Sequence, residues 1–292
     1  MIATSDRQTG RGLQDKIRFL EGFWPTVATV ECRGGLRAVV FVIFLTVAAG
    51  CSSAPAVHEQ EQATPVPQLR ATVVEEIPHD PTAFTEGLTS DGPGLYESTG
   101  QVGQSQLREL DPKTGAVLRS VPLRADLFGE GMAVVGDRIW QLTWKNGFAI
   151  EWDKATFTEL RQVRLDGEGW GLCFDGKRLV RSDGTDRLRF HDPTSFSETG
   201  SVSVTYQGQP FTGLNALDCV AGQVWANVAG TDQVVRIDPA TGKVTTVVNA
   251  VGLLDNARHV QAGELNGIAD EGNGEFFLTG KYWPAMFRVR FN

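Results

Sequence analysis

The segment LDPKTGAVLRSVPL, Leu110 to Leu123, shows a strand, an Asp-centred turn and a second strand, and this pattern returns three more times along the chain. Self-similarity at an interval of about 20 to 50 residues indicates a repeat architecture. The four copies place an aspartate at the same point of each turn, namely Asp111, Asp153, Asp192 and Asp238. We therefore expect structural repeats, each built from short strands.

A second series of strand-forming segments precedes these turns. It reads EGLTSDG, EGMAVVGD, WGLCFDGK, NALDCVAG and NGIADEGN, and its aligned apolar positions are Leu88, Met132, Leu172, Leu217 and Ile268. Four short strands in a unit of about 45 residues are typical of a propeller blade. The fifth copy has room for three strands only, and the segment Ala71 to Ile77 supplies a fourth, which removes an exposed edge. We predict an all-β fold: a five-bladed β-propeller whose last blade is closed by an N-terminal strand.

The N-terminal part of the chain has the pattern of an export signal. An apolar run follows an arginine and ends in small residues directly before Cys51, which resembles a bacterial lipoprotein cleavage box. The run is shorter than the about 20 apolar residues that a membrane span needs. We interpret residues 1–50 as a signal segment that includes a spurious upstream extension, and Cys51 as a lipidation site. Residues 51–67 are small and polar and predict a disordered tether, so the folded domain covers residues 68–292.

This layout predicts an exported protein that is either a cell-envelope lipoprotein or secreted. Its contact with the membrane is through the lipid on Cys51 alone. The formal net charge of −8 argues against nucleic acid as a partner. Cys173 and Cys219 lie in predicted inner strands of neighbouring repeats, where we expect two buried free thiols, with a disulfide as the alternative.

One position in each repeat is a candidate for function. The residues two places before the aligned apolar positions are Glu86, Glu130, Trp170, Asn215 and Asn266. The first strand of each propeller blade lines the central channel, so equivalent positions at its start converge on one point. We therefore predict a site at the channel entrance that contains two carboxylates, two carboxamides and an indole.

Motifs along the whole folded domain resemble one family. In order they include PHDPTAFTEGL, FGEGM, QLTWKNG, GWGL, LNALD, VWANV and LTGKYWP, between about residues 77 and 291. The series is similar to the glutaminyl cyclotransferases of the plant and bacterial type. The resemblance implies a five-bladed propeller that converts the N-terminal glutamine of peptides to pyroglutamate and releases ammonia. It also implies that the partners are peptides with N-terminal glutamine, that the protein is a monomer and that catalysis requires no cofactor.

The resemblance assigns roles to single residues. Glu130 becomes the group that takes a proton from the α-amine and gives one to the departing nitrogen. Burial of this carboxyl in a narrow channel is expected to raise its pKa, which suits the transfer near neutral pH. Lys281 is placed in the active site, where its charge stabilises the oxyanion or holds Glu130. The implied substrate-binding residues are Phe84, Glu86, Phe128, Trp144, Trp170, Asn215 and Asn266.

Two departures from the family pattern leave alternatives open. The family commonly has glutamine where this chain has Glu86, and an aromatic residue shortly after VWAN where this chain has Ala229. A non-catalytic, envelope-tethered propeller that binds a partner is one alternative. A lactonase-type propeller hydrolase is the other, because carboxylates and carboxamides at the channel mouth are also calcium ligands. A structural divalent metal in the channel is compatible with either function.

Overall fold

The computed structural model describes residues 65–255 and 259–292, and all regular secondary structure in these ranges is β-strand. The predicted all-β class is therefore confirmed. No helix in the described residues is long and apolar enough to cross a membrane. The predictions made for residues 1–50, for Cys51 and for most of the tether fall outside the described residues.

Consecutive strands of the described chain build three separate four-stranded antiparallel sheets. The first holds β2 (Thr85–Asp91), β3 (Gly94–Thr99), β4 (Gln106–Leu110) and β5 (Val117–Pro122). The second holds β6 (Gly129–Val135), β7 (Arg138–Thr143), β8 (Phe148–Asp153) and β9 (Glu159–Arg164). The third holds β10 (Leu172–Phe174), β11 (Leu179–Arg181), β12 (Arg187–His191) and β13 (Glu198–Ser203), and a short pair, β14 (Thr205–Tyr206) and β15 (Gln209–Pro210), follows it.

The remaining strands form one eight-stranded sheet that contains both ends of the described chain. Its first half is β16 (Leu214–Val220), β17 (Gln223–Val228), β18 (Gln233–Ile237) and β19 (Val244–Asn249). Its second half is β20 (Leu265–Gly272), β21 (Glu275–Gly280), β22 (Ala285–Phe291) and β1 (Gln68–Pro78). β1 pairs antiparallel with β22 from Ala71 to Pro78, as predicted from the sequence, and its first three residues pair parallel with β19.

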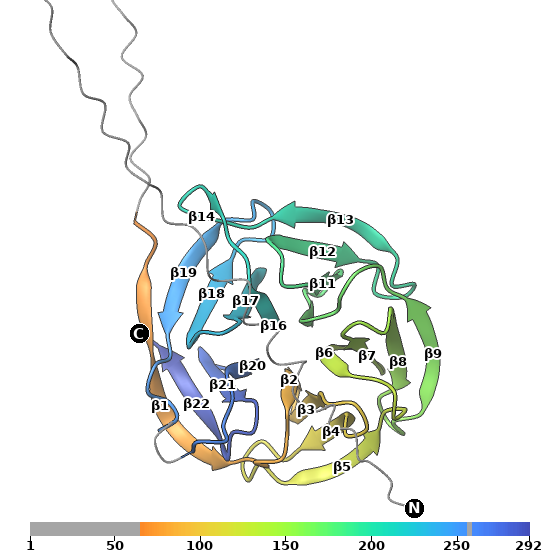
Figure 1. The fold of residues 1–292 in the computed structure, drawn as a ribbon. Coiled ribbons are helices and arrows are strands. Elements are labelled where there is room, and N and C mark those ends of the chain that lie inside the picture. The colour runs from red at the N-terminus through yellow and green to blue at the C-terminus, as the bar shows by residue number, and fades with distance from the viewer. Residues whose placement is uncertain (1–64, 256–258) are drawn as a thin grey trace, which may run out of the picture. The chain divides into compact units, whose positions relative to one another are not determined.

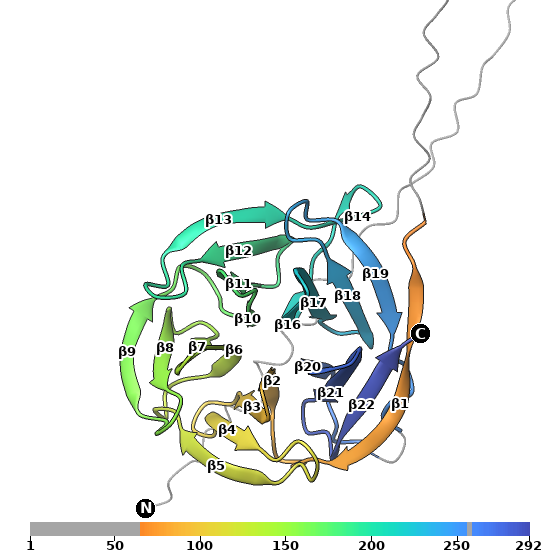
Figure 2. The same cartoon turned by 180° about the vertical axis from the view of Figure 1, so that it is seen from behind.

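The sheets follow one another around a circle, with the first strand of each group toward the middle and the last at the outside (Figure 1 and, from behind, Figure 2). The inner strands contact one another in a closed order: β2 with β6, β6 with β10, β10 with β16, β16 with β20, and β20 with β2. The inner strands are buried along most of their length, whereas β5, β9 and β13 are largely exposed. Equivalent positions of the inner strands are thereby brought close together.

The hydrophobic core lies between neighbouring sheets. Tyr96 and Leu107 of the first sheet pack with Met132, Ile139 and Trp152 of the second, and similar clusters fill the other sheet contacts. The inner strands approach so closely that two positions require glycine. A Cβ on Gly131 would lie 2.5 Å from the carbonyl oxygen of Trp170, and one on Gly171 would lie 2.0 Å from that of Asn215. These close backbone contacts hold the starts of neighbouring inner strands beside one another.

The four repeated aspartates form the outer turns. Asp238 accepts a hydrogen bond from the backbone nitrogen of Ala240 (2.9 Å) and another from the hydroxyl of Thr241 (2.8 Å), and both bonds hold the pKa of its carboxyl below the usual value. Asp111, Asp153 and Asp192 are held in the same way.

The Asp238 turn provides a test of this role. Because the pKa is lowered on folding, the carboxylate stabilises the fold above the pKa of the unfolded chain and loses that effect as the pH falls through the lowered value. Asp238→Ala is expected to reduce Tm by about 2–4 °C at pH 7, whereas Asp238→Asn keeps an acceptor and changes Tm less. Thermal unfolding at pH 7 and pH 3 measures both effects, and an equal loss in the two variants would contradict the turn assignment.

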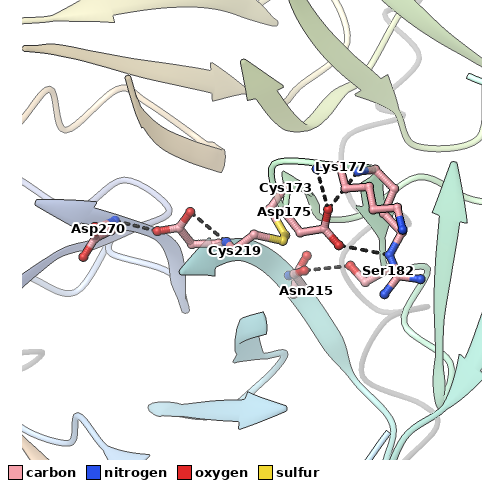
Figure 3. Close-up of a disulfide and its surroundings, with 9 residues drawn as sticks. Cys173, Asp175, Lys177, Ser182, Asn215, Cys219 and Asp270 are labelled. Atoms are coloured by element: carbon pink, nitrogen blue, oxygen red, sulfur yellow. Dashed lines mark hydrogen bonds and ion pairs between the residues drawn. A yellow bond between two sulfur atoms is a disulfide. The ribbon is translucent and has the colours of Figure 1, made fainter. Parts of the chain in front are cut away.

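Cys173 of β10 and Cys219 of β16 form a disulfide (Figure 3), so the expectation of two free thiols is wrong. The inner strands of neighbouring sheets lie side by side, which brings the two Cα atoms to 5.5 Å, a separation typical of disulfides. The bridge joins strands whose starts belong to the candidate site. Beside it, the hydroxyl of Ser182, the residue after β11, donates to the carbonyl oxygen of Asn215 of β16 at 2.7 Å and adds a second link between the two sheets.

Candidate active site

The residues predicted at the channel entrance lie at the starts of the inner strands, and the four acidic or amide members are fully buried. Glu86, Glu130, Asn215 and Asn266 have no exposed surface. Each falls at an irregularity in the pairing of its inner strand, where the register with the second strand shifts. A bulge of this kind bends the strand and redirects a side chain. The fifth member, Trp170, is half-buried and lies two residues before β10.

Lys281 lies in the middle of a buried group of carboxylates. It follows β21 directly and is 4% exposed. Its Nζ is 3.2 Å from Oε1 of Glu86 and 2.6 Å from Oε1 of Glu264. Burial lowers the pKa of this amine, but the charges of Glu86, Glu264 and Glu130 outweigh burial and raise the pKa above its usual value. Lys281 is therefore a permanently charged ammonium group at any physiological pH.

Asn266 connects this group to the strand beside it. Its Nδ2 donates to Oε2 of Glu86 at 2.7 Å and to the backbone oxygen of Thr85 at 3.2 Å, while its Oδ1 accepts from the backbone nitrogen of Ala216 at 3.3 Å. Both the amide nitrogen and the amide oxygen of Asn266 thus form hydrogen bonds. Asn266 fixes one oxygen of Glu86, and Lys281 neutralises the other.

Asn215 differs from Asn266 in one respect that matters for binding. Its side chain is fully buried, yet neither Oδ1 nor Nδ2 forms a hydrogen bond with any residue in the described part of the chain. Buried carboxamides without partners are uncommon, because the lost hydrogen bonds to water cost free energy. The Asn215 side chain is therefore available to a polar ligand.

Aromatic rings form a wall beside the charged group. The ring of Phe84 contacts that of Phe128 (5.9 Å between centroids) and that of Tyr282 (5.1 Å), and Phe128 contacts Trp144 (5.4 Å). The Lys281 ammonium is 4.8 Å from the centroid of Phe84. The predicted aromatic residues Phe84, Phe128 and Trp144 are thus brought together, and Tyr282 extends the wall.

One carboxylate joins the two indoles. Oε2 of Glu168 accepts hydrogen bonds from Nε1 of Trp144 at 2.7 Å and from Nε1 of Trp170 at 3.0 Å. Its Oε1 is 3.4 Å from the ammonium of Lys145. Glu168 therefore sets the orientation of both rings.

Glu168 and Glu264 were missed by the sequence analysis, although the repeat alignment contains a signal for them. Both stand two residues before a predicted site residue, Trp170 and Asn266 respectively. Phe84 and Phe128 occupy the same position in the first two repeats. Phe84, Phe128 and Glu264 directly precede β2, β6 and β20, and Glu168 lies in the loop before β10. This register therefore marks a second set of site residues just outside the inner strands.

Carboxylate and carboxamide oxygens like those at the channel mouth are also potential ligands of a divalent metal ion. The structure describes no group of three or more His, Cys, Asp or Glu side chains placed to hold one. At the channel mouth, both oxygens of Glu86 already face hydrogen-bond donors, Lys281 on one side and Asn266 on the other. The two oxygens of Glu86 thus serve an ammonium group and an amide.

The fold and site define an all-β, propeller-like enzyme whose buried centre combines carboxylates, a lysine and an aromatic wall. The family model described as "Glutamine cyclotransferase" matches residues 43–291. The chain is 36% identical over 225 residues to the glutaminyl-peptide cyclotransferase of Arabidopsis thaliana, a match that covers 75% of this chain and 70% of the relative. It is also similar to the crystal structure of Myxococcus xanthus glutaminyl cyclase, with 40% identity, a TM-score of 0.72, and coverage of 78% of this chain and 99% of that one. The chain belongs to the glutamine cyclotransferase family, as the motif series indicated.

Proposed function

We propose that this enzyme converts the N-terminal glutamine of peptides to pyroglutamate with release of ammonia, and that Glu130 is its proton shuttle. The observation that supports this most directly is the buried group of Glu130, Glu86 and Lys281 beside the aromatic wall. A carboxyl and a fixed cation act on each other, and a buried carboxamide without hydrogen-bond partners in the described residues, Asn215, lies at the start of another inner strand. Cyclisation of glutamine requires these groups and no redox partner.

The reaction transfers one proton from the attacking nitrogen to the departing nitrogen, in two steps, at a single carbon. The α-amine nitrogen attacks the side-chain carbonyl carbon, a new carbon–nitrogen bond forms, and the carbonyl oxygen becomes an oxyanion. The ring nitrogen gives up a proton, the bond to the amide nitrogen breaks, and that nitrogen gains a proton and leaves as ammonia. A carboxylate placed between the two nitrogens performs both transfers, and we assign this role to Glu130.

Lys281 and its partners have a second role in this proposal. The ammonium of Lys281 stabilises the oxyanion, because a fixed charge in a site without water acts strongly on charge that develops in the transition state. Glu86 and Glu264 hold the ammonium in place, and Asn266 is a positioning residue that orients Glu86. Asn215 binds the substrate carboxamide.

Several features argue against the alternative functions. A calcium-dependent hydrolase needs the channel oxygens to face a metal, whereas Glu86 faces Lys281 and Asn266. A non-catalytic binding module has no need of a fully buried lysine held by two carboxylates, which is costly to desolvate. The departure at Glu86 is offset locally, since Lys281 neutralises the additional charge.

We further propose that the described sheets are five blades of a propeller. The eight-stranded sheet then represents two blades that are joined where β1 pairs parallel with β19. On the sequence pattern, we also propose export, lipidation at Cys51 and a monomeric, envelope-anchored state. Labelling of cells with a radioactive fatty acid tests the anchor, because Cys51→Ser abolishes incorporation if Cys51 carries the lipid.

The central experiment measures ammonia released from a glutamine-initiated dipeptide by the purified protein, with and without a chelator. We expect turnover that the chelator does not change. Absence of turnover above background would refute the cyclase function. Loss of turnover with the chelator would show that catalysis needs a metal ion and would refute the metal-free proton-shuttle mechanism.

The role of Glu168 is tested by two substitutions at one position. Glu168→Ala removes the acceptor of both indole N–H groups, so we expect KM for glutamine peptides to rise about three- to tenfold with a smaller change in kcat. Glu168→Gln keeps an acceptor and is expected to restore KM to within about twofold. Tryptophan fluorescence reports ring orientation independently. Equal kinetics of the alanine and glutamine variants would show that Glu168 acts by its charge or by packing.

A further inference from the structure

A cavity of about 210 Å³ lies against the outer side of the aromatic wall, beside the loop that joins β3 and β4. Its lining includes Thr82, Phe84, Gly100, Gln101, Gln104 and Arg108. This volume corresponds to roughly seven water molecules at liquid density, which is room for a short stretch of peptide. None of the roles assigned above uses this cavity.

The cavity is separated from the catalytic group by a single layer of residues. Phe84 lines the cavity and also contacts Phe128 and Lys281. Gly100 lies at the boundary, since a Cβ there would meet the Phe128 ring at 2.5 Å and Cγ of Glu86 at 3.1 Å. Phe84 is therefore a shared wall, with the catalytic group on one side and the cavity on the other.

The loop beside the cavity is held in a defined conformation. Gln101 has φ of +88°, a value that non-glycine residues rarely adopt, and its carbonyl oxygen accepts bonds from the backbone nitrogens of Gln104 (2.9 Å) and Ser105 (2.8 Å). The Ser105 hydroxyl donates to the same carbonyl at 2.9 Å and accepts from the backbone nitrogen of Gly129 at 3.0 Å. Gly129 precedes Glu130, so the loop is tied to the strand that carries the proton shuttle.

The lining offers neutral hydrogen-bonding groups rather than net charge. Arg108 is neutralised by Asp80 (2.9 Å) and Glu97 (3.5 Å) and is further held by Gln106. Gln101 is half-buried and Gln104 is exposed, so their side-chain amides are within reach of a ligand from solvent. Neutral amides match the N–H and C=O groups of a peptide backbone and do not favour an anion.

We propose that this cavity is the subsite for the peptide residues that follow the cyclising glutamine. The proposal rests on the cyclase function. It adds that the enzyme binds longer peptides more tightly, through hydrogen bonds to the main chain of the substrate. One or two neutral hydrogen bonds predict about three- to tenfold tighter binding of a longer peptide than of glutamine amide. The gain is expected in binding and KM, with little change in kcat, because the added contacts are remote from the reacting atoms.

The test measures binding by calorimetry with Glu130→Gln protein, which leaves the peptides intact. The probes are glutamine amide, Gln-Gly and Gln-Gly-Gly. We expect Kd to fall about three- to tenfold from the amide to the tripeptide. In the Gln104→Trp background, whose indole fills the cavity, the gain disappears while the Kd of glutamine amide stays the same. Gln104→Ala is the matched control and retains at least part of the gain.

Equal Kd values for the three probes, or an undiminished gain in Gln104→Trp, would overturn the proposal. Thr82→Trp fills the cavity from another wall and replaces Gln104→Trp if the latter has a lowered Tm. Turnover of Gln-Gly-Gly by the wild-type protein is measured separately. Its absence would refute the cyclase function, whereas the binding series refutes or supports the subsite alone.

Discussion

Glu130→Gln is expected to lower kcat for a glutamine dipeptide by about 10²- to 10⁴-fold, the usual contribution of general acid–base catalysis, while KM changes little. The side chain is fully buried at the start of β6, so the substitution keeps its shape and removes its ability to accept and return a proton. Ammonia release under single-turnover conditions measures the chemical step directly. Activity within about tenfold of the wild type would remove Glu130 from the proton transfer.

The matched control is the same substitution at the neighbouring carboxylate. Glu86→Gln has an equally buried side chain, and its oxygen can still accept from Asn266. The family commonly has glutamine at this position, so we expect kcat to stay within about tenfold of the wild type. A loss as large as that of Glu130→Gln would show that the two carboxylates act together.

The fold was predictable because its signal is repeated. Each repeated turn is held by one aspartate, and each inner strand has a similar run of apolar residues. A wrong strand assignment in one repeat is therefore corrected by alignment with the other repeats. The pairing of β1 with β22 followed from the fifth copy, which has three strands and needs a fourth. Five of the predicted site residues came from one register of the same alignment. Four of these lie at the starts of inner strands, and the fifth, Trp170, lies two residues before β10.

What the sequence did not reveal depends on details of geometry. The register shifts at Glu86 and Glu130 have no local signature beyond a glycine, although they determine where both side chains point. The Cys173–Cys219 disulfide depends on the height of one strand against its neighbour, which spacing alone does not fix. Glu168 and Glu264 act by holding other side chains, and such roles become visible only when distances are known.

Lys281→Met is expected to destabilise the protein more than any other single change discussed above. It removes the cation between Glu86, which is fully buried, and Glu264, which is partly exposed. Breaking a buried ion pair by loss of one partner costs about 3–5 kcal/mol, which lowers Tm by roughly 10 °C in a domain of this size. Lys281→Arg keeps the charge and is the control. An unchanged Tm in Lys281→Met would show that the ammonium contributes no net stability.

The pH dependence of this effect distinguishes lost charge from lost packing. In the wild type the pKa of Lys281 is raised by folding, so the amine stabilises the fold below its unfolded pKa and loses this effect only as the pH rises through the raised value. Without the lysine, the buried carboxylates take up protons more readily when folded, so the deficit of Lys281→Met shrinks as the pH is lowered from 8 to about 5. Adding Glu86→Gln removes one of these charges and is expected to restore part of the lost Tm at pH 8. If the loss of Tm in Lys281→Met is independent of pH and unaffected by Glu86→Gln, the stabilisation comes from packing of the methylene stem of Lys281 and not from its ammonium group.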